Sequence, residues 1–554
     1  MKKSIASLVF LSSTVLVFAG QKIAPDLNLS NPNAAQDVIV QFNGPVSADQ
    51  LKQYGGIVKH VFSRLNTAAV KLPAHVIQQL SSDPNVKYIS PDRTSKGALD
   101  VSTATVNANL VWSYGYTGAG VGVAVIDSGI SLKADLNGAN GVSRVVYSES
   151  FIGVTDASDA YGHGTHVAGI IGGNGSKSSG LSFTRTFKGM APNANLINLR
   201  VLDQNGSGLE SNVMAAIQRA IDLKNTYNIR VLNLSLGHPV YETYKLDPLC
   251  QAVESAWKAG IVVVVAAGNY GRDDSLGTKG YGTIASPGND PYVITVGATN
   301  TKGTASIADD SIATYSSKGP TLIDRIVKPD LVAPGNGVIS ILASPTCTIA
   351  VSYPKTMVQD ATYEIGLPGA SPDYLKLSGT SMATPVVSGA AALLLQKNPA
   401  LTPDQVKARL MKTARKILPS YMSGKDAFTG ALFMSQADIF TVGAGYLDAF
   451  AALQNNDLVT YAALSPAVIL TSTGGGNKVT LQNIVWGDNI VWGESLIWGT
   501  AVFNGTLSSL NIVWGDNIVW GDATTSGYNI IWGSNIVWGD LSMSALSSDD
   551  GDQS

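Results

Sequence analysis

The segment VGVAVID, residues 121–127, is apolar along its length and ends on a carboxylate, Asp127. Similar apolar runs, bounded by Gly, Asn or Asp, follow it at residues 194–202, 230–237 and 261–269. Helix-like stretches lie between these runs, at residues 209–225 and 247–260. Apolar strands that alternate with helices are typical of a parallel sheet with helices on both of its faces. We therefore predict an α/β domain over residues 100–455.

Ligands of such sheets bind outside the carboxyl ends of the strands, and Asp127 lies at one of these ends. A carboxylate in this place can also do no more than cap a turn. The segment YGHGTHVAGIIGG, residues 161–173, adds His163 and His166, which could bind a metal, pack in the core or transfer a proton. A metal site needs further ligands, but no Glu lies between these histidines and neither cysteine is near in sequence. We expect one catalytic histidine and one packed against the same helix.

A third segment, LKLSGTSMATPVVSGAAALLLQ, places Ser381 at the start of an apolar helix. Unpaired backbone N–H groups at a helix N-terminus favour negative charge, which would suit a reacting hydroxyl. A serine that only caps the helix is the simpler alternative. Pro385 is expected in the first turn of this helix, where proline is tolerated.

Taken together, these motifs resemble those of the subtilisin-like serine proteases. The matching motifs are DSG at 127–129, HGTHVAG at 163–169 and GTSMATP at 379–385. They occur in the order Asp, His, Ser, which is the order known for subtilisin. The resemblance covers roughly residues 105–455 and ends with GAGYLDAFAAL, which looks like the last helix of the family's catalytic domain. It implies a serine nucleophile, Ser381, a base and acid, His163, and a carboxylate, Asp127, that orients the histidine.

The same resemblance implies residues that bind substrate. Asn269, which ends the run IVVVVAAGN, would donate to the oxyanion together with the backbone N–H of Ser381, although it could also be a turn residue. A peptide would add a strand between two short segments, for which ordinary Gly-Ser loops are the alternative. These segments are Gly206, Ser207 and Gly208 on one side and Ser235, Leu236 and Gly237 on the other. Ala285 would lie at the floor of the specificity pocket and leave room for large apolar side chains.

Residues 1–20 are predicted to be a secretory signal peptide. Two lysines, Lys2 and Lys3, precede an apolar stretch over residues 5–18 and a small-residue cleavage signature. A membrane anchor is the alternative, but the stretch is short and contains serines. We therefore expect a secreted protein that acts outside the cell or at its surface.

Residues 36–97 are predicted to form a small α+β domain of the ferredoxin-like type. Their pattern is strand, helix, two strands, helix and strand, which is the split βαβ arrangement. The domain resembles the inhibitor propeptide of the subtilisin-like family, which implies that it assists folding and blocks the cleft until it is cut off. The polar connection PDRTSKGALD follows it, and we expect the chain to cut itself between Thr94 and Asp100.

Residues 456–554, the repeat tail, contain a recurring NIVWGD-like unit and seven of the nine tryptophans. The period of six with Gly-Asp or Gly-Ser breaks predicts short strands joined by turns, and hence a β-rich tail. Similar repeats occur as C-terminal extensions of some bacterial members of the family. The tryptophans could build a packed module or bind polysaccharide or other cell-surface material; the packed module is favoured.

Composition narrows the choice of partners and cofactors. The formal charge is −3 and no basic cluster is present, so nucleic acid is not expected as a partner. No organic cofactor is implied. The sequence leaves open whether the protein binds calcium. Residues 174–189 do not match the family's calcium-binding loop, whereas Asp273 and Asp274 could be calcium ligands or part of a solvated loop.

Two cysteines, Cys250 and Cys347, could form a disulfide or remain buried thiols.

The function predicted from the sequence motifs and the resemblance is a secreted serine endopeptidase of broad specificity that is made as a self-cleaving precursor. Two rivals remain: an acid-tolerant peptidase with a carboxylate as base, against which GHGTH argues, and an inert peptidase fold that binds surfaces through its tail.

Overall fold

The computed structural model divides into two compact units, residues 1–95 and 96–554. The structure describes residues 22–24, 27, 29–62, 66–91, 98–275, 277–365, 369–416, 418–419, 421–426, 429–473, 476–482, 490–491, 513–514 and 543–545. The predicted signal peptide lies outside these residues. None of the helices in the described ranges is long and apolar enough to cross a membrane.

The first unit is the predicted small α+β domain, built on one antiparallel sheet with the strand order β2-β3-β1-β4. Its elements are β1 (Ala35–Phe42), α1 (Ala48–Lys52), β2 (Ile57–Phe62), β3 (Thr67–Pro73), α2 (Ala74–Ser81) and β4 (Val86–Pro91). Helix α2 buries Val76, Ile77 and Leu80, which lie on one side at helical spacing. These side chains pack with alternate residues of the strands, such as Val38 and Val40, in one small core. The strand–helix pattern read from the sequence is thereby confirmed.

The second unit is built on an eight-stranded sheet in the order β13-β12-β11-β9-β5-β7-β6, with β14 paired to β12. The strands are β5 (Gly122–Asp127), β6 (Val145–Ser150), β7 (Asn195–Arg200), β9 (Ile229–Leu234), β11 (Val262–Ala266), β12 (Ile294–Asn300), β13 (Ser311–Ile312) and β14 (Leu331–Pro334). All neighbours run parallel except β13, which is antiparallel to β12. The parallel α/β fold predicted from the apolar runs is confirmed.

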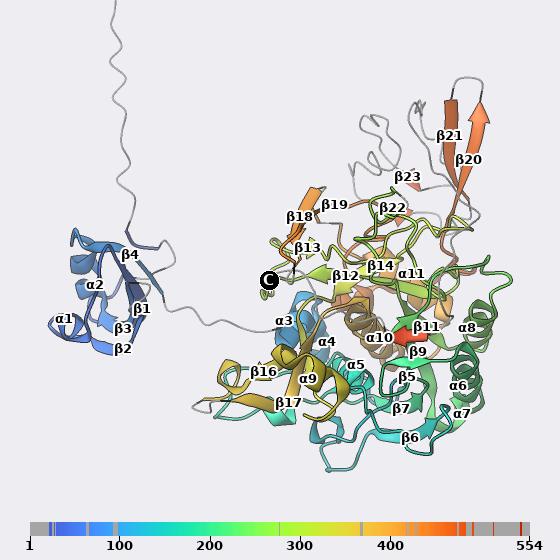
Figure 1. The fold of residues 1–554 in the computed structure, drawn as a ribbon, viewed down its shortest axis with the longest axis horizontal. Coiled ribbons are helices and arrows are strands. Elements are labelled where there is room, and N and C mark those ends of the chain that lie inside the picture. Colours follow the sequence, from blue (N-terminus) through green and yellow to red (C-terminus); the bar gives the residue numbers. More distant parts are fainter. Residues whose placement is uncertain are drawn as a thin grey trace, which may run out of the picture. The chain divides into compact units, whose positions relative to one another are not determined.

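Helices cover both faces of this sheet, as Figure 1 shows. On one face, α5 (His163–Gly172) and α10 (Thr380–Lys397) pack against each other, and α10 is buried from its first residue to Leu395. On the other face, α6 (Glu210–Asp222) and α8 (Pro248–Lys258) each bury a single apolar stripe and remain exposed elsewhere. The remaining helices are α3 (Ala98–Thr105), α4 (Ala108–Ser113), α7 (Lys224–Tyr227), α9 (Thr348–Ser352), α11 (Pro403–Thr413) and α12 (Ala449–Gln454).

Small sheets surround the central one. Three strands, β15 (Val338–Ile341), β17 (Ala370–Leu377) and β16 (Met357–Gln359), form one sheet in this order. Two-stranded pairs are β18 (Tyr421–Lys425) with β19 (Leu432–Gln436), β20 (Ala467–Thr473) with β21 (Gly476–Gln482), and β22 (Ile490–Val491) with β23 (Val513–Trp514). A further three-stranded sheet has the order β10-β24-β8, from Leu236–Gly237, Met543–Ala545 and Ser207–Gly208. Most of the predicted repeat strands of the tail lie outside the described residues.

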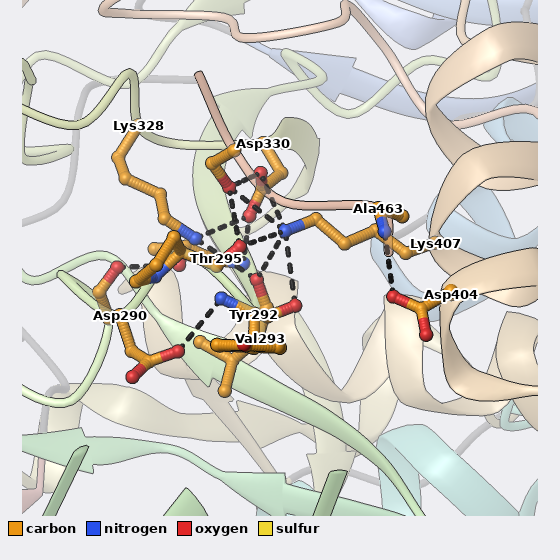
Figure 2. A network of polar contacts seen from close by, with 12 residues as sticks. Asp290, Tyr292, Val293, Thr295, Lys328, Asp330, Asp404, Lys407 and Ala463 are labelled. Carbon is orange, nitrogen blue, oxygen red and sulfur yellow. Dashed lines mark hydrogen bonds and ion pairs between the residues drawn. The ribbon is translucent and has the colours of Figure 1, made fainter. Parts of the chain in front are cut away.

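A buried ionic network joins the segment that follows α12 to the core of the second unit (Figure 2). The Asp330 carboxylate is paired with Lys328 Nζ at 2.8 Å and with Lys407 Nζ at 3.3 Å, and none of the three side chains is exposed. The hydroxyl of Ser465 donates to the same carboxylate at 2.5 Å. Lys407 also donates to the carbonyls of Pro291, Tyr292 and Val293. Because Ala463 belongs to the same core, the packing of this unit continues past residue 455.

Both cysteines are free and buried. Cys250 lies in α8, where its thiol is 3.3 Å from Asn289 Oδ1, and burial raises its pKa. Cys347 precedes α9, and burial also raises its pKa. Of the two possibilities left open by the sequence, the structure has the pair of buried thiols.

Candidate active site

The site lies where the order of strands reverses. Strand β5 has β7 and β6 on one side, and β9, β11 and β12 on the other. Such a switch point leaves a crevice at the carboxyl ends of the strands. Asp127 is the last residue of β5 and is 1% exposed, so the topology buries a carboxylate at this crevice.

Asp127 is hydrogen-bonded to His163. The distance between Asp127 Oδ1 and His163 Nδ1 is 2.7 Å, and both side chains are buried. An ionised carboxylate only accepts hydrogen bonds, so this contact assigns the imidazole proton to Nδ1 and leaves Nε2 as an acceptor. Among the described residues, His163 Nε2 has no hydrogen-bond partner although it is buried. The pair is therefore arranged so that Nε2 can take a proton from another group.

The loop before His163 is held by a second buried carboxylate, that of Asp159. It accepts hydrogen bonds from the Gly162 N–H at 2.7 Å, the Thr165 N–H at 2.8 Å and the Ser128 hydroxyl at 2.8 Å. Burial raises the pKa of Asp159, and these hydrogen bonds lower it. Since Ser128 follows Asp127 and Thr165 is in α5, Asp159 connects both halves of the Asp127–His163 pair.

His166 points into the core, as expected for the second histidine of the motif. Its Nε2 lies 3.1 Å from the carbonyl oxygens of both Val338 and Leu375, to which it donates. Burial, followed by the nearby His163, lowers its pKa to about 3. At neutral pH this imidazole is uncharged and its contacts are with the backbone of β15 and β17.

Ser381 is the second residue of α10 and is also buried. Its Oγ donates to the Ser235 carbonyl at 3.0 Å, and the Ser235 Oγ donates to the Ser381 carbonyl at 2.9 Å. The Asn233 side chain donates to Ser235 Oγ at 3.0 Å and accepts from the hydroxyl of Ser388 at 2.8 Å. The end of β9 and the start of α10 are thus joined, and the Ser381 hydroxyl is directed to a backbone carbonyl rather than to His163.

Asn269 follows β11, and its amide is oriented by Thr380. The Asn269 Oδ1 accepts from the Thr380 N–H at 2.9 Å and from the Thr380 hydroxyl at 3.0 Å. Because Oδ1 faces these donors, Nδ2 is on the opposite side of the amide. Within the described part of the chain, this Nδ2 is buried without a hydrogen-bond partner. An unused donor thus lies next to the residue that precedes Ser381.

The two predicted substrate-binding segments are short strands, β8 and β10. Glycine is required in β8, because a Cβ on Gly208 would lie 2.2 Å from the Val201 carbonyl oxygen. Gly206, just before β8, has φ +75° and packs against the Tyr161 ring. Ala285 is 1% exposed and its N–H donates to the Ala267 carbonyl at 2.9 Å, close to Asn269 in sequence.

In the described parts of the loops considered for calcium, the carboxylates accept hydrogen bonds from the chain itself. Near residues 174–189, the Asp135 carboxylate accepts from Ser176 Oγ, the Lys177 N–H and the Tyr374 hydroxyl, so both of its oxygens have donors. Asp273 and Asp274 accept backbone N–H groups of their own loop. In the described ranges, no group of three or more His, Cys, Asp or Glu residues could hold a metal ion. No step of the chemistry is assigned to a calcium ion.

Sequence reasoning missed the supporting residues Asp159, Asn233 and Thr380. Asp159 had one local signal, since a carboxylate a few residues before a helix start commonly accepts its first N–H groups. Asn233 and Thr380 act through partners that lie far from them in sequence. No local pattern predicts such contacts.

Comparisons with known proteins find related sequences for parts of both units. A sequence model described as the subtilase family matches residues 118–444, and one described as the fervidolysin N-terminal prodomain matches residues 34–92. The chain is 38% identical to serine protease AprX of Bacillus subtilis (strain 168) over 362 residues, which cover 64% of this chain and 75% of that protein. It is 34% identical to subtilisin E of the same organism over 435 residues, covering 76% of this chain and 97% of subtilisin E. An alkaline protease of Alkalihalobacillus alcalophilus is 34% identical over 361 residues, which are 65% of this chain and 76% of that protein.

Proposed function

The chain belongs to the subtilase family and is a serine endopeptidase with an N-terminal prodomain, and we propose that Ser381, His163 and Asp127 are its catalytic triad. The observation that carries this proposal is the buried 2.7 Å contact between Asp127 and His163, which leaves Nε2 as an unpartnered acceptor among the described residues. A serine hydroxyl is a weak nucleophile and needs such a base.

In the proposed reaction, the Ser381 hydroxyl turns from the Ser235 carbonyl toward His163 when a peptide binds. Oγ attacks the peptide carbonyl carbon while Nε2 takes the hydroxyl proton. Asp127 stabilises the imidazolium that results. His163 then gives the proton to the departing amine, and water hydrolyses the ester on Ser381 by the same steps. In catalytic sites without substrate, hydrogen bonds between the catalytic groups are often long or not yet formed, and they tighten when substrate binds.

The negative oxygen of the tetrahedral intermediate requires donors, for which we propose Asn269 Nδ2 and the Ser381 N–H. The fixed direction of the Asn269 amide supports this role, because a donor that is already oriented needs no rearrangement during the reaction. The start of α10 adds the favourable end of a helix dipole.

Substrate backbone would lie between Ser207–Gly208 and Leu236–Gly237, with Gly206 and Ser235 at the adjoining positions. Recognition through main-chain hydrogen bonds depends little on sequence and supports broad specificity. Ala285, small and buried, would form the floor of a pocket for a large apolar side chain.

We further propose that residues 1–20 direct export, so that the enzyme acts outside the cell, and that residues 36–97 inhibit it until they are cut off. The proposed cut, between Thr94 and Asp100, lies partly outside the described residues. The assignment of residues 100–455 as the peptidase domain and 456–554 as the tail remains a prediction, as do calcium binding and contact of the tail with polysaccharide or the cell surface.

The triad is tested with purified precursor and three chains: the parent, Ser381→Ala and Ser378→Ala. Ser378 is a matched control, since its hydroxyl accepts only a loop N–H, that of Gly337, in the bonds described. Intact mass reports the loss of residues up to about 97, and hydrolysis of an added peptide reports activity. We expect the parent and Ser378→Ala to lose these residues and to hydrolyse the peptide, and Ser381→Ala to do neither.

Retention of both activities by Ser381→Ala would reject the triad and favour the carboxylate-based rival. A folded parent that neither cuts itself nor cleaves the peptide would favour the inert scaffold. If all three chains are trimmed equally, another protease made the cut, and peptide hydrolysis alone decides.

A further inference from the structure

The backbone around Asn269 is fastened to one neighbouring segment, residues 314–317. The Ser317 N–H donates to the Gly268 carbonyl at 2.9 Å, and the Tyr270 N–H donates to Ser317 Oγ at 3.0 Å. Ser317 therefore holds both the residue before Asn269 and the residue after it. These two contacts fix the position from which the Asn269 side chain starts.

The contact with this segment continues at the next two residues of the chain. The Gly271 N–H donates to the Tyr315 carbonyl at 2.8 Å, and a Cβ on Gly271 would lie 2.1 Å from the Ser316 carbonyl oxygen. Glycine is therefore needed for so close an approach. Arg272 follows, and its Nε donates to the Thr314 hydroxyl at 2.9 Å. The run of contacts that begins beside Asn269 thus ends on a guanidinium group.

This guanidinium also contacts the β18–β19 hairpin. Arg272 forms an ion pair with Asp426, the residue after β18, and the two side chains are 14% and 3% exposed. Its central carbon lies 5.2 Å from the centroid of the Phe433 ring in β19 and 5.7 Å from that of the Tyr315 ring. A flat cation over aromatic rings and beside a carboxylate uses the charge, the N–H groups and the shape of arginine together. Lysine cannot reproduce all of these contacts.

The hairpin is itself packed on the central sheet. β18 contacts β13, the edge strand from which residues 314–317 continue, and Figure 1 shows the hairpin beside it. The Ile312 N–H of β13 donates to Met422 Sδ of β18 at 3.3 Å. The Asp426 carboxylate is held as well, since it accepts from the N–H and the hydroxyl of Thr429. Arg272 therefore joins the chain after Asn269 to a hairpin that the sheet supports.

We infer that Arg272 is a positioning residue for the reaction, which holds residues 269–272 against the β18–β19 hairpin so that Asn269 Nδ2 keeps its direction. The inference rests on the proposed function, in which this Nδ2 donates to the negative oxygen of the intermediate. Donors that are oriented in advance stabilise such a charge most, because nothing has to reorganise as the charge develops. In this scheme Arg272 touches no reacting atom and acts only through Asn269.

This role predicts which kinetic constant changes. The partners of Arg272 described above belong to neither β8 nor β10, the proposed walls for substrate. Loss of these partners should leave substrate binding as it is and weaken only the stabilisation of the transition state. We therefore expect an effect on kcat with little change in KM.

The test measures kcat and KM of the full chain on a chromogenic peptide, with active sites counted by covalent reaction with a sulfonyl fluoride. Counting sites removes incomplete folding or maturation from kcat. Arg272→Lys keeps the charge but loses the flat donor group, whereas Phe433→Leu removes one ring and leaves the ion pair. Arg219→Lys is the matched control, because Arg219 of α6 pairs with Glu149 of β6 and has no part in these contacts.

Each substitution is also placed in the Asn269→Ala background. Arg272→Lys should lower kcat by roughly 10-fold, below the roughly 10²-fold that a misplacement of about 1 Å can cause. Phe433→Leu should lower it by less, and Arg219→Lys should leave it unchanged. In the Asn269→Ala background neither Arg272→Lys nor Phe433→Leu should lower kcat further, because the amide that they position is gone. A residue that only supported the fold would not distinguish the two backgrounds.

An unchanged kcat in both Arg272→Lys and Phe433→Leu would overturn the inference. A loss mainly in KM, a loss of equal size in the Asn269→Ala background, or an equal loss in Arg219→Lys would also overturn it. The proposed function stands in these cases if Asn269→Ala alone lowers kcat. If Arg272→Lys yields no sites that react, Phe433→Leu decides. If Asn269→Ala leaves kcat unchanged, the proposed oxyanion donor is wrong, and this inference falls with it.

Discussion

The side-chain oxygen of Asn269 accepts two hydrogen bonds from Thr380, one from its N–H at 2.9 Å and one from its hydroxyl at 3.0 Å. Thr380 is the residue immediately before Ser381, at the start of α10. The amide that we propose as an oxyanion donor and the helix that carries the proposed nucleophile are therefore held together directly. A second contact, from the Gly268 N–H to the Thr380 hydroxyl at 3.2 Å, adds to this connection.

Asn269→Ala should lower kcat by about 10²–10³-fold with little change in KM, the loss known when one oxyanion-hole donor is removed from a subtilisin. The physical reason is that the amide contacts only the charge that develops in the transition state. Steady-state kinetics on a peptide substrate measures the changes in kcat and in KM separately. A loss confined to KM would contradict the assigned role.

Thr380→Val should lower kcat by less than Asn269→Ala, because the backbone N–H still holds the amide oxygen. Thr380→Ser keeps the hydroxyl and should restore most of the activity. Rescue by serine, with KM unchanged in both variants, identifies a positioning residue. If valine and serine behaved alike, the hydroxyl would have no part in orienting Asn269.

Asp159→Asn should destabilise the fold by about 1–3 kcal/mol, since an amide NH₂ would face N–H or O–H donors in a buried place. Asp156→Asn is the matched control, because Asp156 is exposed and its carboxylate accepts only from Ser158 in the bonds described. Denaturant unfolding in the Ser381→Ala background avoids self-digestion. Equal effects of the two substitutions would argue against a special role for Asp159.

Lys407→Met should lower the free energy of unfolding by about 3–5 kcal/mol, the usual effect of breaking a buried ion pair from one side. The substitution leaves the carbonyls of Pro291, Tyr292 and Val293 without this donor (Figure 2). Lys412→Met, on the same helix but half-exposed in its pair with Asp457, should cost about 0–1 kcal/mol. A small effect at Lys407 would show that the network contributes little to joining the segment after α12.

The stability of the fold should depend on pH through His166. Its folded pKa of about 3 lies below the ordinary value of 6.5, so the folded state resists protonation. The contribution is present above pH 6.5 and is lost as the pH falls toward 3, with a slope of at most about 1.4 kcal/mol per pH unit. His166→Gln in the Ser381→Ala background should flatten this part of the curve, as measured by denaturant unfolding at several pH values. An unchanged slope in the His166→Gln variant would mean that other titrating groups cause the pH dependence of stability.

Much of the site could be predicted from local patterns. Asp127 ends an apolar strand, and His163 and Ser381 begin helices, so topology alone brings them to one edge of the sheet. The lack of further metal ligands predicted one catalytic and one packed histidine, and the resemblance to the subtilisin-like family implied that His163 is the catalytic one. The order of elements predicts where these residues lie, whereas their proposed roles rest on the resemblance.

The supporting contacts could not be predicted, for a different reason. Asn233 meets Ser388 across two elements that are far apart in sequence, and either residue alone is an ordinary polar side chain. The sequence did predict that a peptide would lie between β8 and β10. It did not predict that residues 543–545 would do so, because three residues carry no periodic signal and backbone pairing is nearly independent of sequence.

The position of β24 in the chain also has a consequence for synthesis. Roughly 300 residues separate Gly237 from Met543, and ribosomes add roughly 5–20 residues per second. Both walls are therefore translated roughly 15–60 s before the strand that joins them. Once Ser381 has been made, a nascent chain has the proposed walls and the proposed nucleophile but not β24, and the prodomain, which we propose as an inhibitor, has already been translated.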